Sequence, residues 1–320
     1  MKKTLIVQAF LDRPKRGTEF SFLRTALAVK ADVCTTSRLF EMIFRPKGHD
    51  IPNVEIQDKF IKMYMREKLN HCKTDYDFVM TQEASSLPAI QFARRIGAKS
   101  ILFLRSLVNI SEMSKATKLA DIVVANSEFI KGRYSPFRGD VKLLYPPIGL
   151  DRFNSISKKT NTYIGMVSPT LSKGGQIFAD LAAKIPGRKF LAVGRKLIRI
   201  RFPSNVKCVK WIDDMRDFYS QSSVVVIPSI WDEPFCRVAP EAQACGVPVI
   251  STKMGGLPES NAGQLFVDNP YDLEEWMERI REAEDNREKY IEAGLKNASR
   301  FDEREYYRKL KDIMKEYENC

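Results

Sequence analysis

Histidine is scarce in this chain, since only His49 and His71 occur among 320 residues. The six cysteines include no CxxC pair and stand apart from any histidine cluster, which argues against a zinc site and against a disulfide framework. Catalysis by a histidine-bound metal is therefore nearly excluded, and the cysteines are expected to be thiols in or near the core.

Long apolar runs are also missing. The apolar stretch that follows the first two lysines ends after about seven residues at charge and proline, which is too short for a signal-peptide core or a membrane span. Elsewhere no window approaches eighteen uninterrupted apolar residues. These absences predict a cytoplasmic protein.

Acidic residues are under-represented in one half of the chain. The whole sequence has 52 Lys+Arg and 40 Asp+Glu, a net charge of +12. Residues 1–150 contain 25 basic and 15 acidic residues (+10), and the remainder contains 52 − 25 = 27 and 40 − 15 = 25 (+2). A basic half favours an anionic acceptor, an anionic membrane surface or nucleic acid, although a generally basic proteome explains it equally well.

Short runs rich in Val, Ile and Phe alternate with helix-period segments, which is typical of βα units around a parallel sheet. In the first half, strands are expected near residues 4–10, 31–36, 78–82, 99–104, 121–126 and 141–145. In the second half, the expected strands are YIGMV, KFLAVG, VKCVKW, SVVVIPS, PVIST and QLFVD. The sequence therefore predicts an α/β protein built from two Rossmann-like halves.

A polar stretch at 155–162 without apolar periodicity is the best domain boundary. We expect a first domain over residues 1–155, a second over 156–300, and a C-terminal helix over 301–320 that returns to the first domain. From Pro270 onward the chain reads as charged amphipathic surface helices.

The end of the strand SVVVIPS is the most informative point of the sequence. Val224–Ile227 predict a buried strand that Pro228 stops. The following loop lies at the carboxyl end of the strand, where doubly wound folds bind ligands. Because Pro234 disfavours a helical residue before it, Glu233 is expected to be extended within this loop.

A helix is expected from near Cys236 to just before Gly246, with Glu241 about one turn inside. Its first backbone N–H groups, at Phe235–Val238, are where a diphosphate would be held. Two carboxylates beside an anion site can accept hydrogen bonds from hydroxyls, one set on a sugar and the other on a ribose. The spacing of Glu233 and Glu241 alone is weak evidence, because acidic residues are common.

The segment EPFCRVAPEAQACGVPVISTKMGGLPE resembles the donor-site segment of glycosyltransferase family 4, whose members are retaining enzymes of the GT-B fold. The resemblance implies two Rossmann-like domains whose parallel sheets face a cleft, with C-terminal helices packing back on the first domain. It also implies that Glu233 contacts the transferred sugar and Glu241 the ribose. The implied donor-binding residues on this segment are Glu233, Pro234, Phe235, Cys236, Arg237, Val238 and Glu241.

A second segment, YIGMVSPTLSKGGQIFADLAAKIPGRKFLAVG, is similar to the part of the family in which a lysine before glycine neutralises the diphosphate. That implies roles for Lys173 and Gly174. Many relatives have an arginine five residues before the lysine, where this chain has Ser168. Ser168 is kept in the donor site, and the second cation is expected from Arg195 or Arg237.

The first half departs from the family pattern. Its first loop offers one glycine, Gly17, followed by Thr18, and we keep both as acceptor or phosphate-loop candidates. Neither histidine stands at the end of a predicted strand, where many members place one near the transferred sugar. Gln82, Glu83 or Arg105 follow the corresponding strands, and Arg105 is the catalytic candidate beside Lys173 and Glu233. Cys236 replaces the usual glycine, which we interpret as a tolerated substitution.

The resemblance implies transfer of a sugar from a nucleotide-diphosphate sugar to a glycan or lipid-linked acceptor, as in the hexosyltransferases. In such enzymes the leaving diphosphate helps to deprotonate the acceptor, so the protein supplies positioning and charge stabilisation. No cofactor or metal is required. Asp75 and Asp77 superficially match the Asp-x-Asp pair of metal-dependent enzymes, but they precede a strand and read as a polar turn.

Two alternatives stay open: a catalytically silent protein that binds nucleotide sugar or RNA on the same scaffold, and a sugar-nucleotide epimerase or hydrolase with this fold. The sequence lacks an aromatic-interleaved basic motif, so nucleic acid is not the expected partner. The basic first half suggests a polyanionic or lipid-linked acceptor, with peripheral contact at an anionic membrane surface.

Overall fold

The structure is a computed structural model. It describes residues 2–8, 17–35, 54–56, 59–61, 63–65, 69, 72–82, 86–107, 110–153, 160–194, 200–210, 212 and 214–317. The chain forms two compact units, Met1–Pro147 with Tyr306–Cys320 and Ile148–Glu305. The boundaries expected from the sequence were 155/156 and 300/301.

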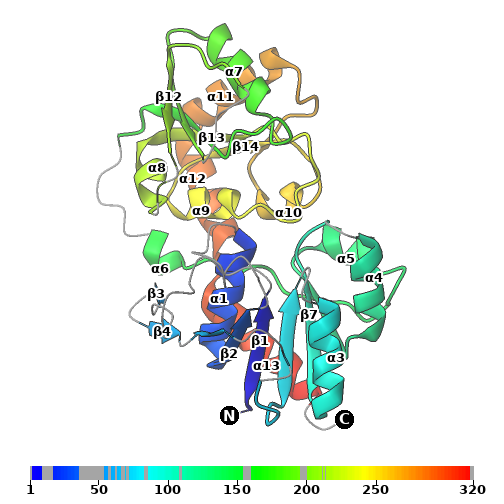
Figure 1. The fold of residues 1–320 in the computed structure, drawn as a ribbon. Coiled ribbons are helices and arrows are strands. Elements are labelled where there is room, and N and C mark those ends of the chain that lie inside the picture. Colours follow the sequence, from blue (N-terminus) through cyan, green and yellow to red (C-terminus); the bar gives the residue numbers. More distant parts are fainter. Residues whose placement is uncertain are drawn as a thin grey trace. The chain divides into compact units, whose positions relative to one another are not determined.

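The first unit is built on a seven-stranded sheet in the order β5-β2-β1-β6-β7-β8-β9 (Figure 1). All neighbouring strands are parallel. The strands are β1 Thr4–Gln8, β2 Asp32–Thr35, β5 Met63–Met65, β6 Phe78–Gln82, β7 Lys99–Leu104, β8 Ile122–Ala125 and β9 Lys142–Leu143. A separate antiparallel ribbon pairs β3 Val54–Ile56 with β4 Lys59–Ile61. The sequence did not predict β3, β4 or β5.

Helices cover both faces of this sheet because its strands are apolar on both sides. Alternate residues of β1 divide between the faces: Ile6 packs in one cluster with α1 and α13, and Leu5 and Val7 in another with α3. The helices of the unit are α1 Gly17–Val29, α3 Ser86–Ile96, α4 Ile110–Leu119, α5 Glu128–Tyr134 and most of α13 Glu303–Glu316.

The C-terminal helix α13 completes the core of the first unit. Its residues Tyr306, Leu310 and Ile313 are buried in the same cluster as Phe22 of α1 and Phe103 of β7. These apolar positions recur at helical spacing on α13, so one face of the helix is buried and the other carries its charges.

The second unit is built on a six-stranded parallel sheet in the order β12-β11-β10-β13-β14-β15. Its strands are β10 Tyr163–Val167, β11 Lys189–Val193, β12 Val206–Val209, β13 Ser222–Ile227, β14 Val249–Ser251 and β15 Leu265–Phe266. All six match strands expected from the sequence. The chain runs outward from β10 in one direction and then returns to β13 on its other side, so the topological switch point lies between β10 and β13.

Helices surround this second sheet, and α11 and α7 enclose Trp276 and Phe178 in its core. The helices are α6 Leu150–Phe153, α7 Gly175–Lys184, α8 Arg216–Gln221, α9 Val238–Ala244, α10 Leu257–Ser260, α11 Leu273–Asp285 and α12 Arg287–Ser299. No described helix is both long and apolar enough to cross a membrane.

Candidate functional site

Two loops meet at the switch point of the second unit. One loop leaves the carboxyl end of β10 and leads to α7, and the other leaves the carboxyl end of β13 and leads to α9. Open α/β sheets bind ligands at this position, because adjacent strands send their loops in opposite directions there and leave a crevice.

The first loop, residues 168–174, is held close to the second. Gly174 has a positive φ of +77°, and a Cβ there would lie 1.8 Å from the carbonyl oxygen of Pro228. The backbone N–H of Ile230 donates to the carbonyl of Ser172 at 3.1 Å. Only glycine allows this approach, which explains why it follows Lys173. The helix expected from Lys173 begins at Gly175, so Lys173 lies in the preceding turn.

The second loop is held in an extended form at Glu233. Glu233 forms a parallel bridge with Gly255, and the N–H of Gly256 donates to the carbonyl of Glu233 at 2.7 Å. Gly255 has a φ of +60°, and a Cβ there would lie 2.4 Å from the same carbonyl. The Gly-Gly pair of the sequence segment therefore fixes the backbone that carries the carboxylate.

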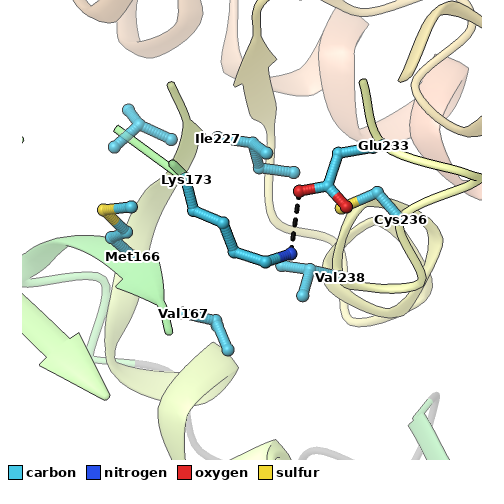
Figure 2. Close-up of a pocket in the computed structure, with 8 residues that line it drawn as sticks. Met166, Val167, Lys173, Ile227, Glu233, Cys236 and Val238 are labelled. Atoms are coloured by element: carbon cyan, nitrogen blue, oxygen red, sulfur yellow. Dashed lines mark hydrogen bonds and ion pairs between the residues drawn. The ribbon is translucent and has the colours of Figure 1, made fainter. Parts of the chain in front are cut away.

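The two loops bring Lys173 and Glu233 together. Lys173 Nζ lies 2.8 Å from Glu233 Oε1, and both side chains line a small pocket (Figure 2). Glu233 is only 5% exposed, so its carboxylate has lost most of its hydration. The other lining residues are Met166, Val167, Val226, Ile227, Cys236 and Val238.

The charge of Lys173 is maintained by its surroundings. Burial, the largest single cause, lowers the pKa of the ammonium, but the charge of Glu233, the nearby Cys236 and the hydrogen bond to Glu233 together raise it by more, so that the pKa ends above the ordinary value. The pocket therefore presents an ammonium beside a carboxylate, and both are available to a ligand that can separate them.

Cys236 has a left-handed backbone with a φ of +70°. This conformation is costly for a residue with a side chain, which accounts for the glycine at this position in the family pattern. Burial, followed by the charge of Glu233, raises the pKa of the thiol to about 12, so the sulfur is protonated at neutral pH. The backbone N–H groups of Ala239 and Val238 donate toward it.

Glu241 lies in the first turn of α9, as expected, and is held by neighbours of the same unit. Arg237 Nη2 lies 3.0 Å from Glu241 Oε1, and the hydroxyl of Tyr219 donates to Oε2 at 3.1 Å. Burial, and then the charge of Glu241, raises the pKa of Tyr219 well above its ordinary value, so that hydroxyl keeps its proton. Arg237, a candidate for the second cation, is thus engaged with Glu241. The helix itself starts at Val238, slightly later than expected.

Ser168, the other donor-side candidate of the first loop, has a positive φ of 55° and donates its backbone N–H to Val193 at 2.6 Å. It therefore shapes the start of the loop that carries Lys173. Arg195 lies outside the described residues.

The candidates of the first unit lie at the carboxyl ends of β6 and β7. Arg105 is 4% exposed; its guanidinium donates to Gln82 Oε1 at 3.3 Å and to the Tyr306 hydroxyl at 3.1 Å. It also lies over the ring of Phe103, 4.6 Å from the centroid. Arg105 is thus held inside the first unit by α13 and β6.

Gly17 and Thr18 begin α1, but their side chains are not described, and Glu83 lies outside the described residues. Asp75 and Asp77 precede β6, as the sequence predicted, and both bond to Lys3.

Sequence reasoning missed Ser229, which is fully buried beside Glu233. Its Oγ donates to the carbonyl of Trp231 at 2.9 Å and lies 3.3 Å from Glu233 Oε1. The available signal was a serine directly after the proline that stops β13, four residues before the glutamate.

Comparisons with known proteins point to one family. Residues 176–300 match the family described as "Glycosyl transferases group 1". A D-inositol 3-phosphate glycosyltransferase of Mycolicibacterium smegmatis is 26% identical over 202 residues, which are 52% of this chain and 46% of the relative. A D-inositol 3-phosphate glycosyltransferase of Streptomyces bingchenggensis is 54% identical over 46 residues, which are 14% of this chain and 10% of that protein. The chain thus spans less than half the length of these curated relatives.

Solved structures resemble nearly the whole chain. HepE of Anabaena in complex with UDP has a TM-score of 0.76 at 16% identity, covering 98% of this chain and 100% of its own. Sucrose-phosphate synthase from Thermosynechococcus elongatus has a TM-score of 0.74 at 18% identity, with 98% and 99% coverage. At these identities the likeness concerns the fold.

Proposed function

We propose that this chain, whose residues 176–300 match the group 1 glycosyl transferases and which has the GT-B fold, is a glycosyltransferase that moves a sugar from a nucleotide-diphosphate donor with retention of anomeric configuration. The observation that carries the proposal is the Lys173–Glu233 pair in a pocket at the switch point of the second unit. An ammonium suits a diphosphate, and a carboxylate suits the hydroxyls of a sugar.

The charges of the pocket suit a donor that leaves as an anion. Lys173 would bind the diphosphate and stabilise the negative charge that grows on it as the glycosidic bond breaks. Glu233 would accept hydrogen bonds from the transferred sugar and hold it in the reactive orientation. Glu241, oriented by Arg237 and Tyr219, would accept from the ribose. The departing phosphate would take the proton of the acceptor hydroxyl.

UDP is the first nucleotide to test, because the HepE structures of the same fold contain UDP, UDP with glucose, and UDP-glucose. For the acceptor we propose a glycan or a lipid-linked sugar, and a role in polysaccharide biosynthesis on the cytoplasmic side of a membrane. The support is the charge of +10 on residues 1–150, which favours an anionic acceptor or an anionic membrane surface.

Turnover tests the proposal directly. UDP-, GDP- and ADP-sugars are incubated with the full chain, and nucleoside diphosphate release is measured with and without glycan acceptors. We expect one donor class to be consumed, and Glu233→Gln to reduce kcat on the order of 100-fold by removing an interaction with the transition state. Asp232→Asn removes a carboxylate from the same loop and serves as the matched control.

Three outcomes would reject transfer. Binding of a nucleotide sugar without release of nucleoside diphosphate would indicate a silent binder. Release of nucleoside diphosphate without transfer of the sugar to any acceptor would indicate a hydrolase. Isomerisation of the sugar would indicate an epimerase. Equal losses in Glu233→Gln and Asp232→Asn would remove Glu233 from the catalytic site.

Metal removal gives an independent check. Because Lys173 supplies a cation at the pocket, we expect donor turnover to be the same after exhaustive treatment with EDTA as before it. Loss of turnover that manganese or magnesium restores would contradict the proposal that no metal is required.

A further inference from the structure

Glu233 has two hydrogen-bonding neighbours on one of its oxygens. Among the described residues, Lys173 Nζ at 2.8 Å and Ser229 Oγ at 3.3 Å are the side-chain groups that bond this carboxylate, and both do so at Oε1 (Figure 2 shows the lysine contact). Among the described residues, no side-chain donor bonds Oε2.

Ser229 has one proton and two acceptors within reach. Its Oγ lies 2.9 Å from the carbonyl oxygen of Trp231 and 3.3 Å from Glu233 Oε1. Its own carbonyl accepts from the Thr252 hydroxyl at 2.7 Å, and the residue is fully buried. The serine is therefore fixed in place, and only the direction of its O–H bond can change.

A bound diphosphate would change which acceptor the Ser229 hydroxyl bonds. Its negative charge attracts the Lys173 ammonium away from Oε1, and a buried carboxylate that loses its cation without another donor is strongly destabilised. The proton of Ser229 can then turn from the Trp231 carbonyl to Glu233, because both acceptors lie within reach of Oγ.

Building on the function proposed above, we infer that Ser229 is a positioning residue for glycosyl transfer: it holds the Glu233 carboxylate when the donor diphosphate withdraws Lys173. The serine contributes little while Lys173 remains on Glu233 and more when the lysine is engaged elsewhere. Lys173 and Ser229, the two donors to Oε1, can thus partly replace each other. Removing both should lower the stability of the protein by more than the sum of the two single removals.

A double-mutant cycle on stability tests the contact without any substrate. Lys173→Met keeps the apolar stem of the lysine and removes its charge. We expect Ser229→Ala to lower Tm by about 3 °C in the wild type and by at least about 6 °C in the Lys173→Met background. Ser222→Ala is the matched control, because Ser222 is also buried on β13 but donates to the carbonyl of Phe218 at 2.9 Å. Its effect should be equal in both backgrounds.

Turnover separates a positioning role from a structural one. With the donor that the wild type consumes, Ser229→Ala should lower kcat about tenfold while KM for the donor changes less than threefold, since a hydrogen bond to a charged group is lost mainly in the reacting complex. Ser229→Thr, which keeps the hydroxyl, should recover most of kcat, and Ser222→Ala should leave it unchanged.

Additive Tm losses in the cycle, or equal kcat in Ser229→Ala and the wild type, would overturn the inference while leaving the proposed function intact. Absence of donor turnover in the wild type would instead reject the proposed function. The stability cycle would still show whether Ser229 and Lys173 share Glu233.

Discussion

Cys236 has a strained backbone conformation that the segments on either side of it require. The chain must turn between the extended backbone at Glu233 and the helix that starts at Val238, and it does so with a φ of +70° at Cys236. A Cβ in this conformation costs roughly 1–2 kcal/mol, which glycine avoids. The sequence resemblance alone could indicate only that the substitution is tolerated.

Alanine usually gives a more stable protein than glycine, but the left-handed conformation at Cys236 predicts the opposite at this position. Both Cys236→Ala and Cys236→Gly lose the thiol, but only glycine relieves the left-handed backbone, so Cys236→Gly should be about 1 kcal/mol more stable to unfolding than Cys236→Ala. Urea titration of the two variants measures the difference.

Cys208 supplies the control, because it lies within strand β12 and has no positive φ. There glycine should be the less stable variant by roughly 0.5–1 kcal/mol. The same order at both positions would show that strain at Cys236 is negligible.

The sequence indicated some residues of the candidate site and gave no indication of others. Lys173 and Glu233 were implied by the family resemblance of the loops that follow two strands, and the structure places their side chains together. Ser229 was not, because its relation to Glu233 depends on the turn after Pro228 and not on residue type. Arg105 was placed at a strand end correctly, but its packing under α13 requires a contact between residues about 200 positions apart.

At the scale of elements, glycines let the two site loops approach each other. Gly174 meets the carbonyl of Pro228, and Gly255 meets that of Glu233. These contacts connect β10 and β13 to the β14–α10 segment, so the pocket depends on backbone packing as much as on its charged side chains.

Gly174→Ala tests this dependence. The added Cβ would fall 1.8 Å from a backbone oxygen in a left-handed conformation, so the loops must separate. We expect a loss of about 3 kcal/mol in the free energy of unfolding, together with loss of nucleotide binding. The measurement is a urea titration with and without the nucleoside diphosphate.

Gly187→Ala is the matched control, since a Cβ there meets nothing within 4 Å and the residue has no positive φ. It should leave both stability and binding within error of the wild type. Wild-type behaviour of Gly174→Ala would mean that the close packing of the loops is unimportant.

Element types were largely predictable, and small elements were not. Runs such as Val224–Ile227 predict buried parallel strands because they are apolar on both faces and end at a proline. The three-residue strands β3, β4 and β5 offer no alternation long enough to recognise. The start of α9 was placed too early because the left-handed turn at Cys236 cannot be read from its residue type.

At the scale of the whole molecule, the chain passes between its two units twice. The first passage falls before Ile148, because Ile148 is fully buried and its N–H donates to the carbonyl of Phe301, and because Phe153 packs on Tyr219. The polar stretch at 155–162, which was the sequence-based boundary, is therefore preceded by residues of the second unit. A composition change marks where a chain becomes polar, not where its contacts change.

The account depends most on the claim that Lys173 binds the diphosphate of a donor. Calorimetric titration of the full chain with UDP, GDP and ADP tests it directly. We predict that one of them binds and that Lys173→Met weakens its binding at least about tenfold, as expected for a lost charge-assisted contact. Lys184→Met, at an exposed lysine of α7, should leave the affinity unchanged. Equal affinity in Lys173→Met and the wild type, or no binding of any of the three nucleotides, would contradict the claim.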